Sequence, residues 1–194
     1  MRLVLPLLLL AHAAIAAAPA APTAPAAPAR TLVAAKSAIT FAGQQMGVAV
    51  KGRFGKFDAD IAFDPAHPEN AHAAVGVATA SVTLDDSETD DTVRSKAWLD
   101  AAGFPRAEFR SSGGFKALGK GRYSAAGTLT VKNKGQPATF EFTATEGQDG
   151  TLIAGELPIR RSVFGIGGGE WNSSDVVADA VTVQVRLLLA PAGK

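Results

Sequence analysis

The chain has 194 residues, 47% of them hydrophobic, and its 19 Lys and Arg against 18 Asp and Glu give a formal net charge of +1. This balance excludes a general electrostatic attraction to nucleic acid or to an anionic membrane surface. The chain has no cysteine, so disulfides cannot stabilise it, and the hydrophobic core of one domain must suffice.

The N-terminal thirty residues precede the predicted domain. A basic start, an apolar run from Leu3 to Leu10 and the small residues Ala14 and Ala16 predict a signal peptide at 1–16. The apolar run is too short for a permanent membrane span. Residues 17–30 are almost wholly Ala and Pro, which predicts an extended linker. We therefore expect a domain at 31–190 that is periplasmic or secreted.

From Thr31 onward the apolar residues alternate with period two, which indicates strands. Within the second strand the apolar set changes parity between Phe54 and Phe57. A slip of one residue would turn the apolar face outward, so the pattern predicts a β-bulge near Gly55, with this glycine at positive φ. The third strand, residues 71–84, also changes parity. Long strands of this kind are typical of strongly curved sheets and barrels.

Residues 85–99 are the one convincing helix of the domain. Acidic residues stand at its start and Arg94 and Lys96 follow, as the helix dipole favours. The acidic stretch Asp86–Asp90 could also suggest a calcium loop, but it lacks the central glycine and the twelfth-position glutamate of such loops. A solvated helix start is the favoured interpretation.

Five further strands follow the helix, and tight turns separate several of the strands. The strands are expected at 107–115, 123–131, 138–144, 153–159 and 181–189, and turns at 43–45, 132–135 and 147–150. Asn133 and Gly135 are expected to supply positive φ. Together, the three strands before the helix and the five after it predict an all-β fold of eight antiparallel strands with one helix between strands 3 and 4. A barrel or a sandwich fits the spacing, and the parity changes favour the barrel.

The stretch 156–171 is the most unusual part of the domain. Phe164 and Trp171 flank Gly165 and Gly167–Gly169, which indicates a shaped rim. The glycines resemble half of a dinucleotide fingerprint, but no βαβ pattern precedes them. Catalytic motifs are absent from the sequence, and His67 and His72 fit a surface pair better than a zinc site. Small residues between the aromatics leave two alternatives open, a pore or a filled core.

Four motifs, in order along the chain, carry a resemblance to a known family. They are Gln45-Met-Gly-Val-x-Val50-x-Gly52-x-Phe54, Phe104-Pro-x-Ala107-x-Phe109, Gly127-x-Leu129-Thr-x-Lys132 and Arg161-Ser-Val-Phe-Gly-Ile-Gly167. They resemble the YceI-like family of exported lipid-binding proteins over residues 31–189. The resemblance implies an extended, lipocalin-like barrel whose pore takes a polyisoprenoid quinone or a fatty-acid derivative. Because the residues show no catalytic or metal-binding motif, catalytic residues, a metal and a cofactor are not expected.

The resemblance also implies where the ligand binds. It makes the motif residues Phe54, Phe104, Phe109, Arg161, Phe164 and Trp171 candidates for the pocket and its mouth. The other candidate ligand-binding residues are Phe57, Trp98, Phe140, Phe142 and Ile166. Arg161 would anchor a polar head group at the mouth, or else form a salt bridge with Glu170 or Asp179 that fixes the glycine loop (Gly165–Gly169).

The expected function is a periplasmic carrier that holds a long apolar ligand and is not an enzyme. A filled-barrel structural or interaction module of the cell envelope is the alternative, and a lipid-modifying enzyme using Glu170 and Arg161 is less favoured. The expected partners are the lipid ligand, a transient membrane or electron-transport contact, and a second copy in a homodimer. Nucleic acid is not among them.

Overall fold

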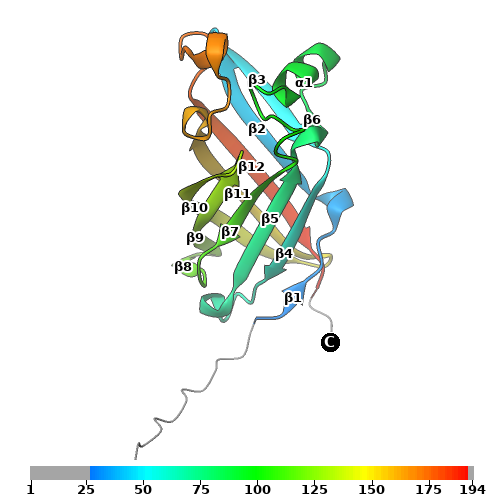
Figure 1. The fold of residues 1–194 in the computed structure, drawn as a ribbon. Coiled ribbons are helices and arrows are strands. Elements are labelled where there is room, and N and C mark those ends of the chain that lie inside the picture. Colours follow the sequence, from blue (N-terminus) through cyan, green and yellow to red (C-terminus); the bar gives the residue numbers. More distant parts are fainter. Residues whose placement is uncertain (1–26, 192–194) are drawn as a thin grey trace, which may run out of the picture.

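The computed structural model describes residues 27–191, which form one curled antiparallel sheet (Figure 1). Its twelve strands are β1 (Ala29–Arg30), β2 (Ala38–Gln45), β3 (Val48–Phe54), β4 (Phe57–Ala62), β5 (His72–Ala78), β6 (Val82–Thr83), β7 (Arg106–Ser111), β8 (Lys116–Gly119), β9 (Arg122–Val131), β10 (Lys134–Gly147), β11 (Gly150–Arg160) and β12 (Ala180–Leu189). The strand order is β1-β4-β5-β7-β9-β10-β11-β12-β2-β3-β6, and β8 pairs with β9.

A bend in one long strand closes the sheet into a barrel. β3 pairs with β2 and β4 pairs with β5, so the two ends of the strand order meet at Gly55 and Lys56. Counting β3 and β4 as one strand, and setting aside the short β1, β6 and β8, leaves eight long strands. The predicted all-β barrel is therefore confirmed, with more strands assigned than expected because of these short pieces.

The predicted irregularity at Gly55 lies where the two halves of the bent strand join, but its geometry differs. Phe54 and Phe57 both pack against the core despite their opposite parity. Gly55 is not among the glycines with positive φ, so the expectation of a left-handed bulge residue is wrong. Instead, the Gly55 amide donates to the carbonyl of Ser81 at 2.9 Å, and Lys56 accepts from the Ala78 amide at 2.9 Å. The chain bends there by exchanging β-sheet partners.

The only α-helix of the described residues, α1 (Ser87–Arg94), lies between β6 and β7 at one end of the barrel (Figure 1). Asp86 caps it by accepting a hydrogen bond from the Thr89 amide at 2.9 Å. α1 is shorter than the predicted 85–99, because Ser95 is extended and tight turns follow it. Five short 3-10 helices complete the fold: η1 (Ala34–Lys36), η2 (Pro68–Asn70), η3 (Thr79–Ser81), η4 (Arg161–Phe164) and η5 (Gly169–Asn172).

Two hairpin turns differ from the expected positions. β2 continues through Gln45, and the turn is made by Met46 and Gly47, with φ of 49° and 78°. The β9–β10 turn uses Lys132 and Asn133, with φ of 50° and 57°. Asn133 is therefore at positive φ as predicted, whereas Gly135 belongs to β10. Both are two-residue turns whose positive φ values suit the twist of a hairpin.

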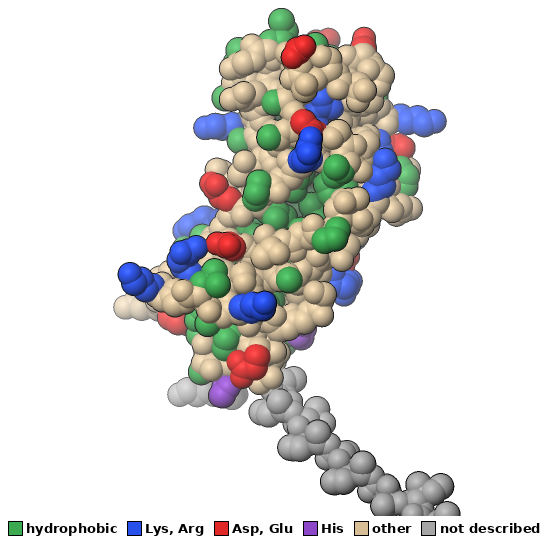
Figure 2. All heavy atoms as spheres, turned by 90° about the vertical axis from the view of Figure 1, so that its left-hand side faces the viewer, with side chains coloured by type: hydrophobic (Ala, Val, Ile, Leu, Met, Phe, Trp, Pro, Cys, Tyr) green, Lys and Arg blue, Asp and Glu red, His purple; other side chains and the backbone are tan. Residues whose placement is uncertain are grey.

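The buried hydrophobic residues form two clusters. The larger lies toward the end that carries β1 and includes Phe63, Phe115, Tyr123, Phe142 and Leu187, while the smaller joins Val82, Leu99, Val131 and Phe164 toward the α1 end. On the outside, cationic and anionic side chains are interspersed with hydrophobic ones on the face shown in Figure 2.

The N-terminal predictions fall mostly outside the described residues. The signal peptide and residues 17–26 of the linker precede them. The sheet begins at Ala29 rather than after residue 30, because β1 pairs with β4 through Ala29 and Ala62. In residues 27–191, helices with the length and apolar character of a membrane span are absent.

Candidate functional site

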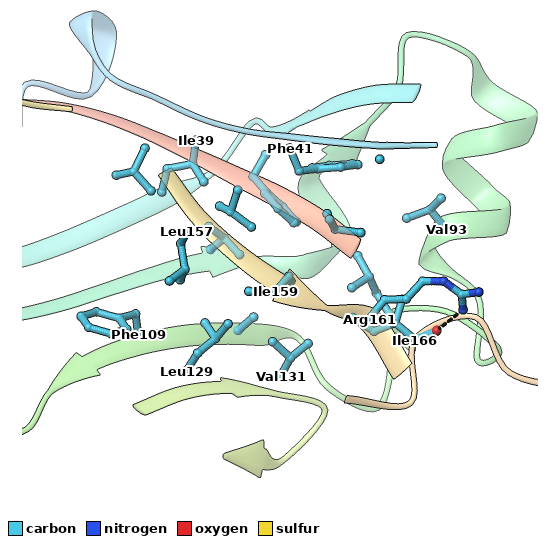
Figure 3. A pocket seen from close by; sticks show the side chains of 18 of the residues that line it. Ile39, Phe41, Val93, Phe109, Leu129, Val131, Leu157, Ile159, Arg161 and Ile166 are labelled. Carbon is cyan, nitrogen blue, oxygen red and sulfur yellow. Dashed lines mark hydrogen bonds between the residues drawn. The ribbon is translucent and has the colours of Figure 1, made fainter. Parts of the chain in front are cut away.

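A cavity of about 430 Å³ runs along the inside of the barrel. Its wall is built almost wholly from inward-facing aliphatic and aromatic side chains of β2, β3, β4, β5, β7, β9, β10, β11 and β12. Figure 3 shows Ile39, Phe109, Leu129, Leu157 and Ile159 converging on it from opposite walls. The volume lies within the range of small-molecule sites, and the lining suits an apolar ligand.

Three phenylalanines lie flat against the wall because a neighbouring strand has a glycine beneath each ring. A Cβ added to Gly52 would lie 2.3 Å from the ring of Phe41. At Gly127 it would lie 2.8 Å from the Phe109 ring, and at Gly155 the rim of Phe140 is 3.0 Å away. Each ring occupies the space of a missing side chain, which leaves the middle of the barrel open.

The mouth of the cavity lies at the end that carries α1 and the β2–β3 hairpin. Exposed polar residues line it there, namely Gln44, Gln45, Asp86 and Glu88, so the cavity meets solvent at this end. Trp98 and Trp171 stand beside the mouth with ring centroids 5.7 Å apart. The gradient from polar mouth to apolar interior would place a ligand's polar end at the mouth.

The opposite end is closed by packed aromatic rings, which we call the aromatic floor (Phe63, Phe115, Tyr123 and Phe142). The ring centroids of Phe115 and Phe142 are 5.6 Å apart, and those of Phe63 and Tyr123 are 5.1 Å apart. Phe115 and Phe142 line the cavity, while Phe63 and Tyr123 lie outside its lining. The cavity is therefore a one-ended pocket.

Arg161 is buried at the mouth, with 3% of its surface exposed, and every one of its N–H groups donates to a backbone carbonyl. The acceptors lie at 2.7–3.2 Å and belong to Ile166, Gly167, Trp171, Val177 and Ala178. A guanidinium has five N–H donors, so none remains for a ligand head group. Its carbon also lies 5.9 Å from the centroid of the Trp98 ring.

Both expectations for Arg161 are therefore corrected. Its donors are not free to anchor a head group, and it forms no salt bridge with Glu170 or Asp179 among the described residues. Asp179 instead pairs with the neighbouring Arg160 at 2.8 Å. Arg161 does fix the glycine loop, through carbonyls rather than a carboxylate. Gly167 is required next to it, because a Cβ there would lie 2.5 Å from a guanidinium nitrogen and φ is +73°.

Lys132 is a structural residue of the same region that the sequence analysis did not single out for this role. Its ammonium donates to the carbonyls of Lys96, Trp98 and Gly165 at 2.8–3.2 Å. Burial lowers the pKa of this lysine. The ammonium thus joins the turn after α1 to the glycine loop. The only sequence feature that pointed to Lys132 was the motif Gly127-x-Leu129-Thr-x-Lys132, which ends at this residue.

The structure places eight of the eleven candidate residues on the cavity wall. They are Phe54, Trp98, Phe109, Phe140, Phe142, Arg161, Ile166 and Trp171. Phe57 and Phe104 are partly buried but lie outside the lining, Phe57 because it packs against the larger core cluster. Further lining residues that the sequence analysis did not propose include Phe41, Leu129, Val131, Leu157 and Val183.

Phe164 is the third candidate outside the cavity wall. It is 2% exposed and packs with Val82, Leu99 and Val131, so its expected place in a rim is wrong and it belongs to the core. Because η4 turns the chain directly after Arg161, the Phe164 ring points into this cluster. Trp171, on η5, does line the mouth as expected.

A closed antiparallel barrel around an apolar pocket with one polar mouth defines the lipocalin-like class of barrels. Residues 31–189 match the family described as "YceI-like domain", and the chain belongs to this family. The match covers the whole barrel, from the residue after β1 to the end of β12.

Curated relatives of this chain include proteins of Pseudomonas and Vibrio species. A UPF0312 protein of Pseudomonas fluorescens strain SBW25 is 34% identical over 136 residues, which are 67% of this chain and 70% of the relative. A UPF0312 protein of Vibrio cholerae is 32% identical over 118 residues, which are 59% of this chain and 61% of the relative. The alignment thus spans less than two thirds of the Vibrio relative's length.

Solved structures share the fold over most of the barrel. BcnA of Burkholderia cenocepacia is 36% identical with a TM-score of 0.78, covering 80% of this chain and 98% of that one. A polyisoprenoid binding domain from Saccharophagus degradans has a TM-score of 0.68 at 13% identity, covering 84% of this chain and 99% of that domain. At that identity the second likeness shows the fold alone.

Proposed function

We propose that this protein is an exported, non-enzymatic carrier that holds one long apolar molecule, of the isoprenoid or fatty-acyl type, in the barrel cavity. The observation that carries the proposal is the open apolar pocket itself. Three phenylalanine rings pack against glycines of neighbouring strands, so these side chains leave the lumen free. Each methylene that leaves water for such a pocket contributes about 0.8 kcal/mol, so a long chain binds tightly without specific polar contacts.

Two further observations support this proposal over the alternatives. The lining residues of the described chain include no His, Cys, Ser, Lys or Tyr, and the donors of Arg161 are all used. The carboxylates that line the cavity are Asp86 and Glu88 at its mouth and Glu108 on β7, and a Ser, Cys or Lys nucleophile paired with a base is not among these lining residues. The Saccharophagus fold neighbour is described as a polyisoprenoid binding domain, which supports the ligand class.

The site of action follows from the N-terminal sequence and from the nature of the ligand. The predicted signal peptide supports a periplasmic or secreted protein. A lipid carrier exchanges its ligand at a membrane, and we propose such a transient contact here. The electron-transport partner and the homodimer stay predictions.

The experiment combines lipid extraction with a variant that blocks the pocket. Purified mature protein is extracted with organic solvent and the extract is analysed by mass spectrometry. Val183 lines the cavity, so Val183→Trp should fill it and lower the amount of bound lipid while the protein stays folded. Val163 is 41% exposed on η4, so Val163→Trp is the matched control and should leave occupancy unchanged.

A wild-type protein that carries no apolar molecule and takes up no added long-chain alcohol would contradict the carrier. The filled-barrel alternative would then stand. Recovery of a chemically altered lipid after incubation would instead point to an enzyme. Circular dichroism and a cooperative melting curve establish that each variant is folded.

A further inference from the structure

The lining of the pocket stops at a definite residue on each of the strands β9, β10 and β12. On β12 the lining extends from Val181 to Leu187 and stops before Leu189, which is fully buried. On β9 it includes Ala125 but not Tyr123, and on β10 it stops at Phe142. The cavity therefore ends at the aromatic floor, of which Phe115 and Phe142 form the surface that faces the lumen.

The rings of the aromatic floor pack closely against one another. Phe142 is central to it, because its ring lies within 5.5–6.0 Å of the rings of Phe63, Phe115, Tyr123 and Phe140. Edge-to-face and stacked pairs at such distances leave little space between rings.

Beneath the floor the barrel is sealed by polar groups. Arg30 donates to the Thr151 hydroxyl at 2.6 Å and to the Phe63 carbonyl at 3.0 Å, and the Thr151 hydroxyl donates to Glu146 at 2.6 Å. Thr151 is fully buried. A hydrocarbon chain that passed the floor would have to break these bonds without replacing them, which is unfavourable.

We propose that the aromatic floor is a chain-length ruler: the ligand enters tail first, and Phe142 with Phe115 sets the longest single chain that the pocket accepts. This inference rests on the proposed function. At about 3.3 Å per residue and a tilt near 40°, the lining of β12 spans roughly 15 Å along the barrel axis. An extended chain advances about 1.2 Å per bond, so the pocket takes on the order of 12 bonds.

The test measures the affinity of the mature, delipidated protein for straight-chain primary alcohols of increasing length. Affinity should rise about fourfold per methylene, corresponding to about 0.8 kcal/mol, until the tail reaches the floor, and should then stop rising. Phe142→Leu should move this break to longer chains. Ala73, which lines the cavity close to the floor, gives the converse variant: Ala73→Leu should move the break to shorter chains.

Phe57→Leu is the matched control, because Phe57 packs against the same core cluster but lies outside the cavity lining. Its break should equal that of the wild type. If Phe142→Leu does not fold, Phe115→Leu replaces it, since Phe115 is the other floor residue that lines the pocket. A break that stays in place in the folded floor variants and in Ala73→Leu would overturn the ruler, as would an affinity that rises without a break. Absence of binding at every length in the wild type would instead overturn the proposed function.

Discussion

Arg161 stabilises the mouth of the barrel, because its hydrogen bonds to backbone carbonyls connect the segments before and after η5. Arg161→Met keeps much of the side-chain length but removes every donor, and the carbonyls that it serves would lose their partners in a buried place. Each unsatisfied buried group costs about 1–3 kcal/mol, so we expect the free energy of unfolding to fall by at least about 3 kcal/mol in chemical denaturation.

The adjacent arginine provides the control for this substitution. Arg160 has a side chain that is 76% exposed and one ion pair, with Asp179. Arg160→Met should therefore change the free energy of unfolding by about 0–1 kcal/mol. Equal losses in the two variants would show that the carbonyl cluster is not what makes Arg161 structural.

Asp179 predicts a specific sensitivity to acid. Hydrogen bonds from Arg160, and then from Ser162, lower the pKa of its carboxyl to about 2. Because the folded-state pKa lies below the unfolded value of about 3.9, this contribution is present above pH 4 and is lost as pH falls toward 2. Urea unfolding of the wild type and of Asp179→Asn across this range should give free energies that converge at low pH. A constant difference would contradict this linkage.

The roles of these residues were only partly predictable from the sequence. The motif that begins at Arg161 pointed to the right residue, but its partners could not be predicted. Every residue has a carbonyl, so five carbonyl acceptors leave no pattern in the sequence. The role of Lys132 was not predictable for the same reason, because its acceptors are also backbone carbonyls. A carboxylate partner was the natural expectation for a buried arginine, and the fold placed Asp179 beside Arg160 instead.

At the scale of elements, the glycine loop between η4 and η5 owes its shape to contacts as well as to backbone angles. Gly167 and Gly169 have similar φ, +73° and +67°, but only Gly167 has a guanidinium nitrogen where a Cβ would lie, at 2.5 Å. Gly169→Ala should cost about 1–2 kcal/mol for the left-handed angle alone. Gly167→Ala should cost more, because Arg161 must also move. Thermal and chemical unfolding of the pair would test this, and equal costs would contradict it.

At the junction between β3 and β4, replacing a glycine by alanine is not expected to destabilise the protein, in contrast to Gly167 and Gly169. Gly55 is not at positive φ, and a Cβ there would lie 3.5 Å from the Ser81 carbonyl, an ordinary contact. Gly55→Ala should then be neutral or stabilise the protein by up to about 1 kcal/mol, because alanine reduces the entropy of the unfolded chain. A loss of more than about 1 kcal/mol in the melting analysis would mean that the bend needs glycine after all.

The strands and the bend between β3 and β4 were predictable, because the alternation of apolar residues alone determines where they lie. Alternation of apolar residues located the eight long strands, and the change of parity between Phe54 and Phe57 located the bend. The third strand, expected at 71–84, is shorter than predicted, because β5 ends at Ala78 and η3 separates it from the short β6. The turns at 43–45 and 132–135 were misplaced, because a turn's position depends on which residues pair across the hairpin. Gln45 pairs with Val48 in a register that composition does not reveal.

For the whole molecule, the choice between a pore and a filled core could not be made from the sequence. It depends on whether each phenylalanine meets a glycine on the next strand, which is a matter of register. Phe140 lies over Gly155 and Phe41 over Gly52 only because β10–β11 and β2–β3 pair as they do. Shifted pairings would place the same rings in the middle of the barrel.

An open pocket makes the stability of the whole molecule depend on its ligand. A ligand that binds only the folded state stabilises it by RT ln(1 + [L]/Kd), about 2.7 kcal/mol at a hundredfold excess over Kd. Delipidated protein titrated with a long-chain alcohol should therefore show a free energy of unfolding that rises logarithmically with free ligand, by about 2.7 kcal/mol at a hundredfold excess over Kd. The Val183→Trp protein should show no such rise, because the indole would occupy the lumen beside Phe41 and Leu157. A wild-type stability that is independent of ligand would show that the barrel is filled, since a core without free space gains nothing from an added chain.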